Sequence, residues 1–179
     1  GAESYRVAQI LDGAWRSVAT SWSEISTLGK ALQERLAEEI RFSAFDEVER
    51  QEADDGATTK LLLTLADGAK VEAVLMRSPA DPRRGSGPRA TVCVSSQAGC
   101  AVGCPFCATG ELGFGRNLSP GEIQDQVRLA RRILRAEGRE LTNVVFMGMG
   151  EPLQNLDAVL DAISGLTDSK RGAMGQRRI

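Results

Sequence analysis

The chain has 179 residues, of which 42% are hydrophobic and 26% charged, and its formal charge is −2. This composition excludes a disordered chain and a surface that is basic throughout, and the length allows one sizeable core or two small ones. The sequence contains neither an apolar run of about 18 residues nor the pattern of a signal peptide, so we expect a cytoplasmic protein without a membrane span. Histidine is absent, which excludes a histidine ligand or base.

Residues 1–43 are predicted to form a small helical domain. Apolar residues recur at helical spacing from Tyr5 to Trp15, and again from Leu32 to Ile40. The charged residues fall between them, as in helices that bury one face. An apolar core explains these positions without any functional role.

Residues 44–78 change to a period of two, which predicts a β-hairpin around the turn signal Asp67-Gly68. Glu72 falls in this hairpin, on the face opposite Val71 and Ala73. Most carboxylates at such a position simply face solvent. The following segment, 79–89, is rich in Pro, Gly, Ser and Arg and is predicted to be a linker.

Residues 90–179 alternate strands and helices. The strand TVCVSS precedes a cysteine-rich loop, and a helix then begins at Ser119, with Pro120 first and Glu122 completing a capping box. LTNVVFM is a second strand that leads into GMGEP, a second helix follows from Leu156 to Leu166, and GQRRI is predicted to start a third strand. Two β–α units leave a parallel sheet open at its edges, so we interpret the sequence as part of a longer protein.

Three of the four cysteines lie within eight residues, in the pattern CxxxCxxC: Cys100, Cys104 and Cys107. In the reducing cytosol, clustered thiols are more often ligands or catalysts than disulfides. Four thiolates close a zinc site, whereas three on a 4Fe-4S cluster leave one iron open. A zinc site that recruits Cys93 from the preceding strand remains the alternative.

Two further features accompany the cysteines. Phe106 directly precedes Cys107, and the second strand ends in GMGEP, whose glycines allow close approach of a ligand to the backbone. Ligands bind at the carboxyl ends of parallel strands, where both motifs are predicted to face the same space. This combination resembles the radical S-adenosylmethionine (SAM) superfamily.

The resemblance extends to one family. CVSSQAGCAVGCPFCATGELGFGRNLSPGEI and TNVVFMGMGEPLQNLDAV are similar to the RlmN-type RNA adenine methyltransferases, and YRVAQI, TLGKALQERLAEEI and DGAKVEAVLM resemble their N-terminal helices and hairpin. The longer segment 79–89 departs from the family pattern. The alternatives are a Cfr-type enzyme that methylates carbon 8, a non-enzymatic four-cysteine zinc module that binds nucleic acid, and an inactive homologue.

The resemblance implies an α/β fold, namely a partial radical-SAM (β/α) barrel in 90–179 preceded by the helical domain and the hairpin. It also implies that a 4Fe-4S cluster is held by Cys100, Cys104 and Cys107. SAM would bind the open iron, with Gly150 and Glu151 lining its site and Phe106 beside the cofactors.

The implied reaction is methylation of carbon 2 of an adenine in 23S rRNA and in some tRNAs, through a methyl-cysteine and a 5′-deoxyadenosyl radical. Carbon 2 is electron-poor, which is why a radical is needed. Glu72 matches the family's proton acceptor, and Cys93 matches the cysteine that forms a transient disulfide with the methyl carrier; the alternative for Cys93 is a small buried hydrophobe. No cysteine follows Cys107, so this chain is expected to be incomplete as an enzyme. A flavodoxin or ferredoxin would supply electrons to a monomer.

Two groups of arginines are candidates for contact with RNA phosphates. One lies along the helix after Ser119 and just past its end: Arg128, Arg132, Arg135 and Arg139. The other lies in the predicted linker: Arg83, Arg84 and Arg89. For the first group, a solvated helix face with glutamate partners is the alternative.

Overall fold

A mixed five-stranded sheet forms the centre of the computed structural model, which describes residues 4–17 and 19–179, without the side chain of Arg84. The strand order is β1-β2-β3-β4-β7. Their bounds are β1 Phe45–Glu52, β2 Thr58–Leu65, β3 Lys70–Ser78, β4 Arg89–Cys93 and β7 Asn143–Val145. The first four strands pair antiparallel, whereas β4 and β7 pair in parallel. The α/β class predicted from the sequence is confirmed.

The predicted hairpin is β2 and β3, and the sheet continues on both sides of it. β3 pairs with β4, with Val74 opposite Cys93, so the hairpin joins the first strand of the 90–179 region. On the other side it pairs with β1, a strand that the sequence did not predict. β1 reads FDEVERQE and all but its first residue are exposed, so it lacks the alternation of apolar residues that reveals a half-buried strand.

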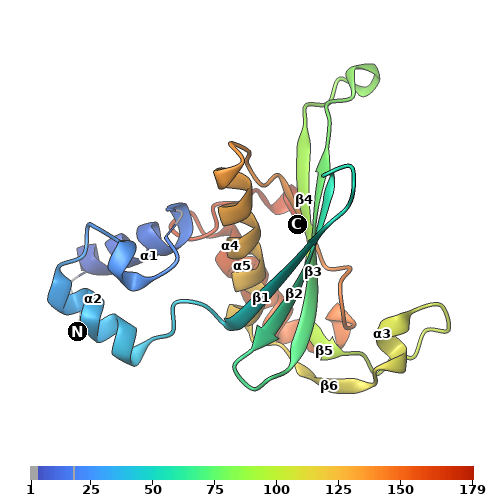
Figure 1. Ribbon diagram of the computed structural model, residues 1–179, viewed down its shortest axis with the longest axis horizontal. Coiled ribbons are helices and arrows are strands. Elements are labelled where there is room, and N and C mark those ends of the chain that lie inside the picture. The colour runs from blue at the N-terminus through green and yellow to red at the C-terminus, as the bar shows by residue number, and fades with distance from the viewer. Residues whose placement is uncertain (1–3, 18) are drawn as a thin grey trace.

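One face of the sheet packs against two helices, α4 (Pro120–Ala136) and α5 (Leu156–Thr167), as Figure 1 shows. The sheet contributes buried alternate residues to this core: Leu61, Leu63, Leu65, Val71, Ala73, Leu75, Val92 and Val144. Helix α4 contributes a stripe at helical spacing: Ile123, Val127, Ala130 and Leu134. The predicted capping box of Ser119 and Glu122 is present at its start.

The N-terminal region contains α1 (Ser4–Arg16) and α2 (Lys30–Glu39). Leu36 joins a small core with Trp22, whereas Ile40 lies just past the helix and is half exposed. In Figure 1 these helices lie on the opposite side of the sheet from the cysteine-rich loop. The remaining helical elements are the short helix α3 (Ala108–Glu111) and 3-10 turns at Trp22–Glu24, Pro82–Arg84, Pro152–Asn155 and Gln176–Arg178.

The third strand expected at GQRRI is wrong, because Gln176–Arg178 is a 3-10 turn. After α5 the chain reverses, with Met174 N donating to Leu166 O (2.9 Å), which buries Met174. The 3-10 turn Gln176–Arg178 follows this reversal. Within 79–89, Asp81 and Ser86 pair around a 3-10 turn; the domain boundaries stay predictions. In the part of the chain that the structure describes, no helix is long and apolar enough to cross a membrane.

Candidate functional site

The carboxyl ends of β4 and β7 lie side by side, and the contact continues beyond the strands. Val94 N donates to Val145 O (2.9 Å), Gly148 N to Val94 O (3.1 Å), and Ser96 N to Met149 O (2.9 Å). The segment that enters the cysteine loop therefore runs against GMGEP. The two motifs predicted to face the same space are adjacent in the structure.

A small hairpin that the sequence did not predict carries the three clustered cysteines. Its strands are β5 (Gln97–Gly99) and β6 (Phe114–Asn117), and the loop between them spans 100–113. The two ends of this loop lie close together, since Cys100 N donates to Gly113 O (2.9 Å). Gly99 has φ +78°, and a Cβ there would lie 2.0 Å from Gly113 O, so only glycine fits this position.

The loop presents its three thiols partly exposed and free. Hydrogen bonds from the backbone and side chain of Thr109 lower the pKa of Cys107 below its ordinary value. Phe106 is 89% exposed on the same loop. Three cysteine thiols with no histidine among them are a donor set that suits iron and sulfide, and each thiolate of a 4Fe-4S cluster binds a different iron.

A single metal ion is a different case, because its ligands must converge on one point. Within residues 4–17 and 19–179, no three Cys, Asp or Glu side chains lie close enough together to bind one metal ion. Cys93 is the last residue of β4 and is buried. Burial raises the pKa of its thiol, against the opposing effect of a hydrogen bond from Met147 N. Cys93 thus lies in the sheet, whereas the other three cysteines lie on the loop between β5 and β6.

Glu72 and Cys93 share one face of the sheet, the face away from α4 and α5. Val74 is paired with Cys93, and Glu72 lies two residues before Val74 on β3. The Glu72 side chain is partly exposed and forms an ion pair with Lys60, with Nζ 2.6 Å from Oε1.

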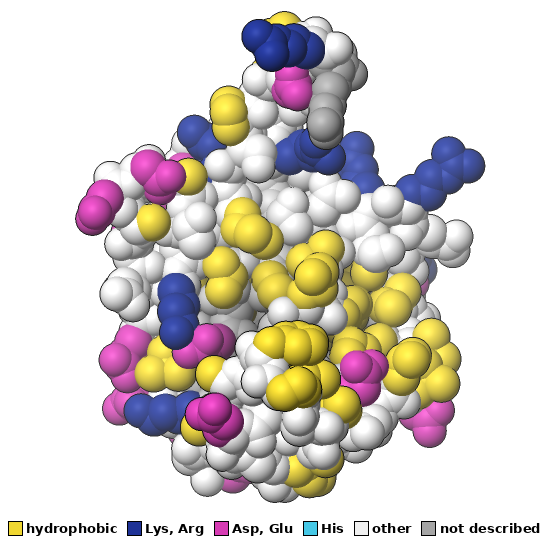
Figure 2. All heavy atoms as spheres, turned by 90° about the vertical axis from the view of Figure 1, so that its right-hand side faces the viewer, with side chains coloured by type: hydrophobic (Ala, Val, Ile, Leu, Met, Phe, Trp, Pro, Cys, Tyr) yellow, Lys and Arg dark blue, Asp and Glu magenta, His cyan; other side chains and the backbone are white. Residues whose placement is uncertain are grey.

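Figure 2 shows the side of the molecule that lies on the right of Figure 1, where hydrophobic side chains gather in the middle of the surface. Large hydrophobic residues of both loops are exposed in the structure: Val102, Phe106, Leu112, Met147 and Leu153. Exposed apolar groups concentrated at two adjacent loops are typical of a binding surface.

A buried polar network, also missed from the sequence, fastens the two loops to the core. Ser95 Oγ donates to Glu72 O (2.6 Å) and accepts from Met149 N (2.9 Å). Gln126, fully buried on α4, bonds to both backbone groups of Ser95. A glutamine within the apolar stripe of α4 was the available signal, since a buried polar group needs partners. Asn155 likewise donates to Ser96 O (2.8 Å).

The GMGEP loop approaches its neighbour so closely that side chains are excluded. A Cβ on Gly148 would lie 2.7 Å from Val94 O, and Gly150 has φ +94°. Glu151 is half-buried; its backbone N–H donates to Gln97 Oε1 (2.9 Å) and its carboxylate accepts from Leu153 N (3.0 Å). The Glu151 carboxylate therefore caps the 3-10 turn Pro152–Asn155.

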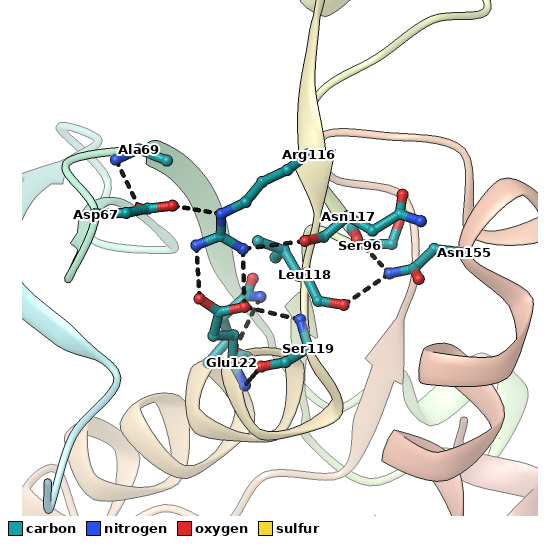
Figure 3. Close-up of polar contacts among 10 residues, drawn as sticks. Asp67, Ala69, Ser96, Arg116, Asn117, Leu118, Ser119, Glu122 and Asn155 are labelled. Atoms are coloured by element: carbon teal, nitrogen blue, oxygen red, sulfur yellow. Dashed lines mark hydrogen bonds and ion pairs between the residues drawn. The ribbon is translucent and has the colours of Figure 1, made fainter.

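Arg116, on β6, ties the cysteine hairpin to two other elements (Figure 3). Its guanidinium forms a paired contact with Glu122, at 2.7 and 3.0 Å, and donates to Asp67 in the β2–β3 turn. Arg116, and then Ala69 N–H, lower the pKa of Asp67 from 3.8 to about 2. Burial alone would raise the pKa of Glu122, but Arg116 and Ser119 together hold it below its ordinary value.

The predicted arginine stripe on α4 is partly engaged inside the molecule. Arg128 bonds to Asp125 and to Phe42 O, and its guanidinium lies 4.5 Å from the centre of the Phe42 ring. Arg135 bonds to Arg16 O. These two side chains hold the N-terminal region against α4, so they are not free for phosphate. The side chain of Arg84, in the other predicted group, lies outside the described residues.

Comparison with known proteins agrees with this geometry, although no protein-family model matches the chain. A radical SAM methyltransferase structure from Sphaerobacter thermophilus superposes with a TM-score of 0.89 at 43% identity, covering 98% of this chain and 49% of that one. The dual-specificity RNA methyltransferase RlmN of Syntrophobacter fumaroxidans is 45% identical over the whole chain, which covers 49% of that protein. A probable RlmN of Thermus thermophilus is 46% identical over 99% of the chain.

In fold and in the arrangement of the two loops the chain is similar to a radical SAM methyltransferase. Within this class its sequence is similar to RlmN proteins, at 43–46% identity over 99–100% of its length. The chain spans about half the length of the curated relatives it matches.

Gly150→Ala is expected to lower the free energy of unfolding by about 1–3 kcal/mol, because alanine at a positive φ is strained and its Cβ would lie 2.5 Å from Gln97 Cβ. Urea denaturation measures the change. Gly87→Ala is the control, since a Cβ there meets nothing within 4 Å. Equal stability of the two variants would contradict the tight contact between the loops.

Arg116→Met is expected to flatten the loss of stability in acid. The folded-state pKa of Asp67 and that of Glu122 are lowered, so both contribute stability above their unfolded pKa values, and that contribution disappears as the pH falls through the folded ones. For Asp67 the window runs from 3.8 to about 2. Urea midpoints at pH 5 and pH 3 should converge more in Arg116→Met than in the parent or in Arg89→Met, an exposed control. An undiminished acid dependence would exclude this ion-pair group.

Proposed function

We propose that the protein is an RNA methyltransferase that uses SAM and a 4Fe-4S cluster to methylate carbon 2 of an adenine in 23S rRNA and in some tRNAs. The observation that carries the proposal is the contact between residues 94–97, which lead into the cysteine loop, and GMGEP at the carboxyl ends of β4 and β7. The names of the relatives, which are RNA methyltransferases, support RNA as the substrate class. The carbon-2 position rests on sequence similarity to this family.

Cys100, Cys104 and Cys107 would hold the cluster, which supplies, when bound, the electron that cleaves SAM to a 5′-deoxyadenosyl radical. Their partial exposure and free thiols support this role. Gly150 and Glu151 would line the SAM site with their backbone. Because GMGEP carries no side chain at Gly148 or Gly150, a ligand can approach its peptide groups directly.

Cys93 and Glu72 would act on the open face of the sheet. Burial raises the pKa of the Cys93 thiol, which favours its protonated form while the site is at rest. Glu72 would accept a proton from the adenine once its carboxylate leaves Lys60. A flavodoxin or ferredoxin would serve as electron donor to a cytoplasmic monomer, and Phe106 would contact the cofactors from the loop.

Iron analysis and low-temperature EPR of anaerobically reconstituted, reduced protein test the proposal. We expect about four irons per chain and a cluster signal that changes when SAM is added. Cys93→Ala should retain the iron, whereas Cys107→Ala should lose it. One zinc per chain that is indifferent to SAM, and that Cys93→Ala abolishes, would overturn the proposal in favour of a structural site.

Glu72→Gln tests the proton acceptor. In a preparation that methylates RNA, this variant is expected to keep its iron and its response to SAM, while the rate falls by about 10²–10⁴-fold because the base is lost. Glu49→Gln is a matched control, since Glu49 is also a strand carboxylate paired with a lysine, Lys70. A rate equal to that of the control would remove Glu72 from this role.

A further inference from the structure

Gln97 occupies the junction between the two loops of the site. It is the first residue of β5, the strand that leads into the cysteine loop, and only 1% of its surface is exposed. Both ends of its amide are hydrogen-bonded to the two sides of the junction. A buried amide with both ends satisfied is held in one orientation, because releasing either bond leaves a polar group without water.

The oxygen end of the amide holds the GMGEP loop. Gln97 Oε1 accepts from Glu151 N (2.9 Å), and Gln97 N donates to Met149 O (3.3 Å). Between these two bonds lies Gly150, where a Cβ would come within 2.5 Å of Gln97 Cβ. Gln97 therefore holds the GMGEP loop by hydrogen bonds on both sides of Gly150.

The nitrogen end holds the cysteine hairpin. Gln97 Nε2 donates to Asn117 Oδ1 (2.8 Å), and Asn117 is the residue paired with Gln97 across β5 and β6. Asn117 itself is exposed. The amide therefore spans from the far strand of the hairpin to the GMGEP backbone.

We propose that Gln97 is a positioning residue that sets the GMGEP loop against the cysteine loop, and so fixes the spacing of the two halves of the SAM site. This deepens the proposed function and rests on it. A ligand that reaches from an iron on one loop to peptide groups on the other needs both halves held in place before it binds. Gln97 acts through the Glu151 peptide, whose position its Oε1 determines.

Gln97→Met tests the positioning directly, because methionine keeps the length and volume and removes both hydrogen bonds. Amide hydrogen exchange, measured on the chain without cofactors, is expected to be about tenfold faster at Glu151. Gln124→Met is the matched control: Gln124 bonds to carbonyls of α5, away from the loops. Unchanged exchange at Glu151 in Gln97→Met would overturn the proposal.

Iron content and SAM binding of the reconstituted protein distinguish a positioning role of Gln97 from a general effect on the stability of the fold. Gln97→Met is expected to retain the iron content of the parent, while the dissociation constant for SAM rises about tenfold, the factor expected for one lost hydrogen bond. Loss of iron and of SAM binding together would mean that Gln97 only stabilises the fold, and SAM binding equal to that of Gln124→Met would also overturn its role.

Two possible results require a further measurement. If Gln97→Met does not fold, Asn117→Ala removes only the nitrogen-end bond from an exposed position; faster exchange at Glu151 supports the proposal and unchanged exchange overturns it. If the parent binds neither iron nor SAM, the proposed function fails, and exchange at Glu151 still decides whether Gln97 positions the loop.

Discussion

The backbone of residues 94–97 runs against that of 148–151, and each part of the site takes its position from this contact. Parallel pairing of β4 and β7 brings the two segments together, and hydrogen bonds continue the pairing past the strand ends. The contact requires glycine at 148 and 150, because a Cβ at either position would overlap backbone or Gln97. The glycines of GMGEP thus serve packing between loops as well as access for a ligand.

Polar groups, which are costly to bury, are concentrated at this contact. Ser95, Gln97, Gln126 and Asn155 are all buried, and each is hydrogen-bonded to backbone of a neighbouring segment. Such a network stabilises one arrangement, since any shift of a loop leaves a buried donor or acceptor without a partner. An apolar contact of the same area would tolerate sliding. The network is therefore suited to a site that needs a fixed geometry before its ligands bind.

Two charged side chains, Arg116 and Arg128, join separate elements of the chain. Arg116 joins the cysteine hairpin to α4 and to the β2–β3 turn, while Arg128 stacks on Phe42 and bonds to its carbonyl. Both arginines connect segments that are distant in sequence. An arginine suits this task because its planar fork makes several bonds at once. Arg128, on α4, therefore contributes to the assembly of the chain.

Local patterns in the sequence determined much of the fold and pointed to the candidate cofactor motifs. The capping box of Ser119 and Glu122 predicted where α4 begins, and alternation predicted β2 and β3, because hydrogen bonding and side-chain direction within a few residues decide such features. CxxxCxxC and GMGEP could be recognised for the same reason, since each motif is defined by residues that lie only a few positions apart.

Tertiary structure alone decided what depends on distant partners. β1 exists because β2 lies beside it, although its own sequence is polar, and GQRRI is a turn because the preceding segment folds back under α5. The roles of Gln97 and Gln126 likewise follow from distant groups, since Gln97 bonds to Glu151, 54 residues away, and Gln126 to Ser95, 31 residues away. A single glutamine has no local pattern, so only the folded chain shows which backbone groups it satisfies.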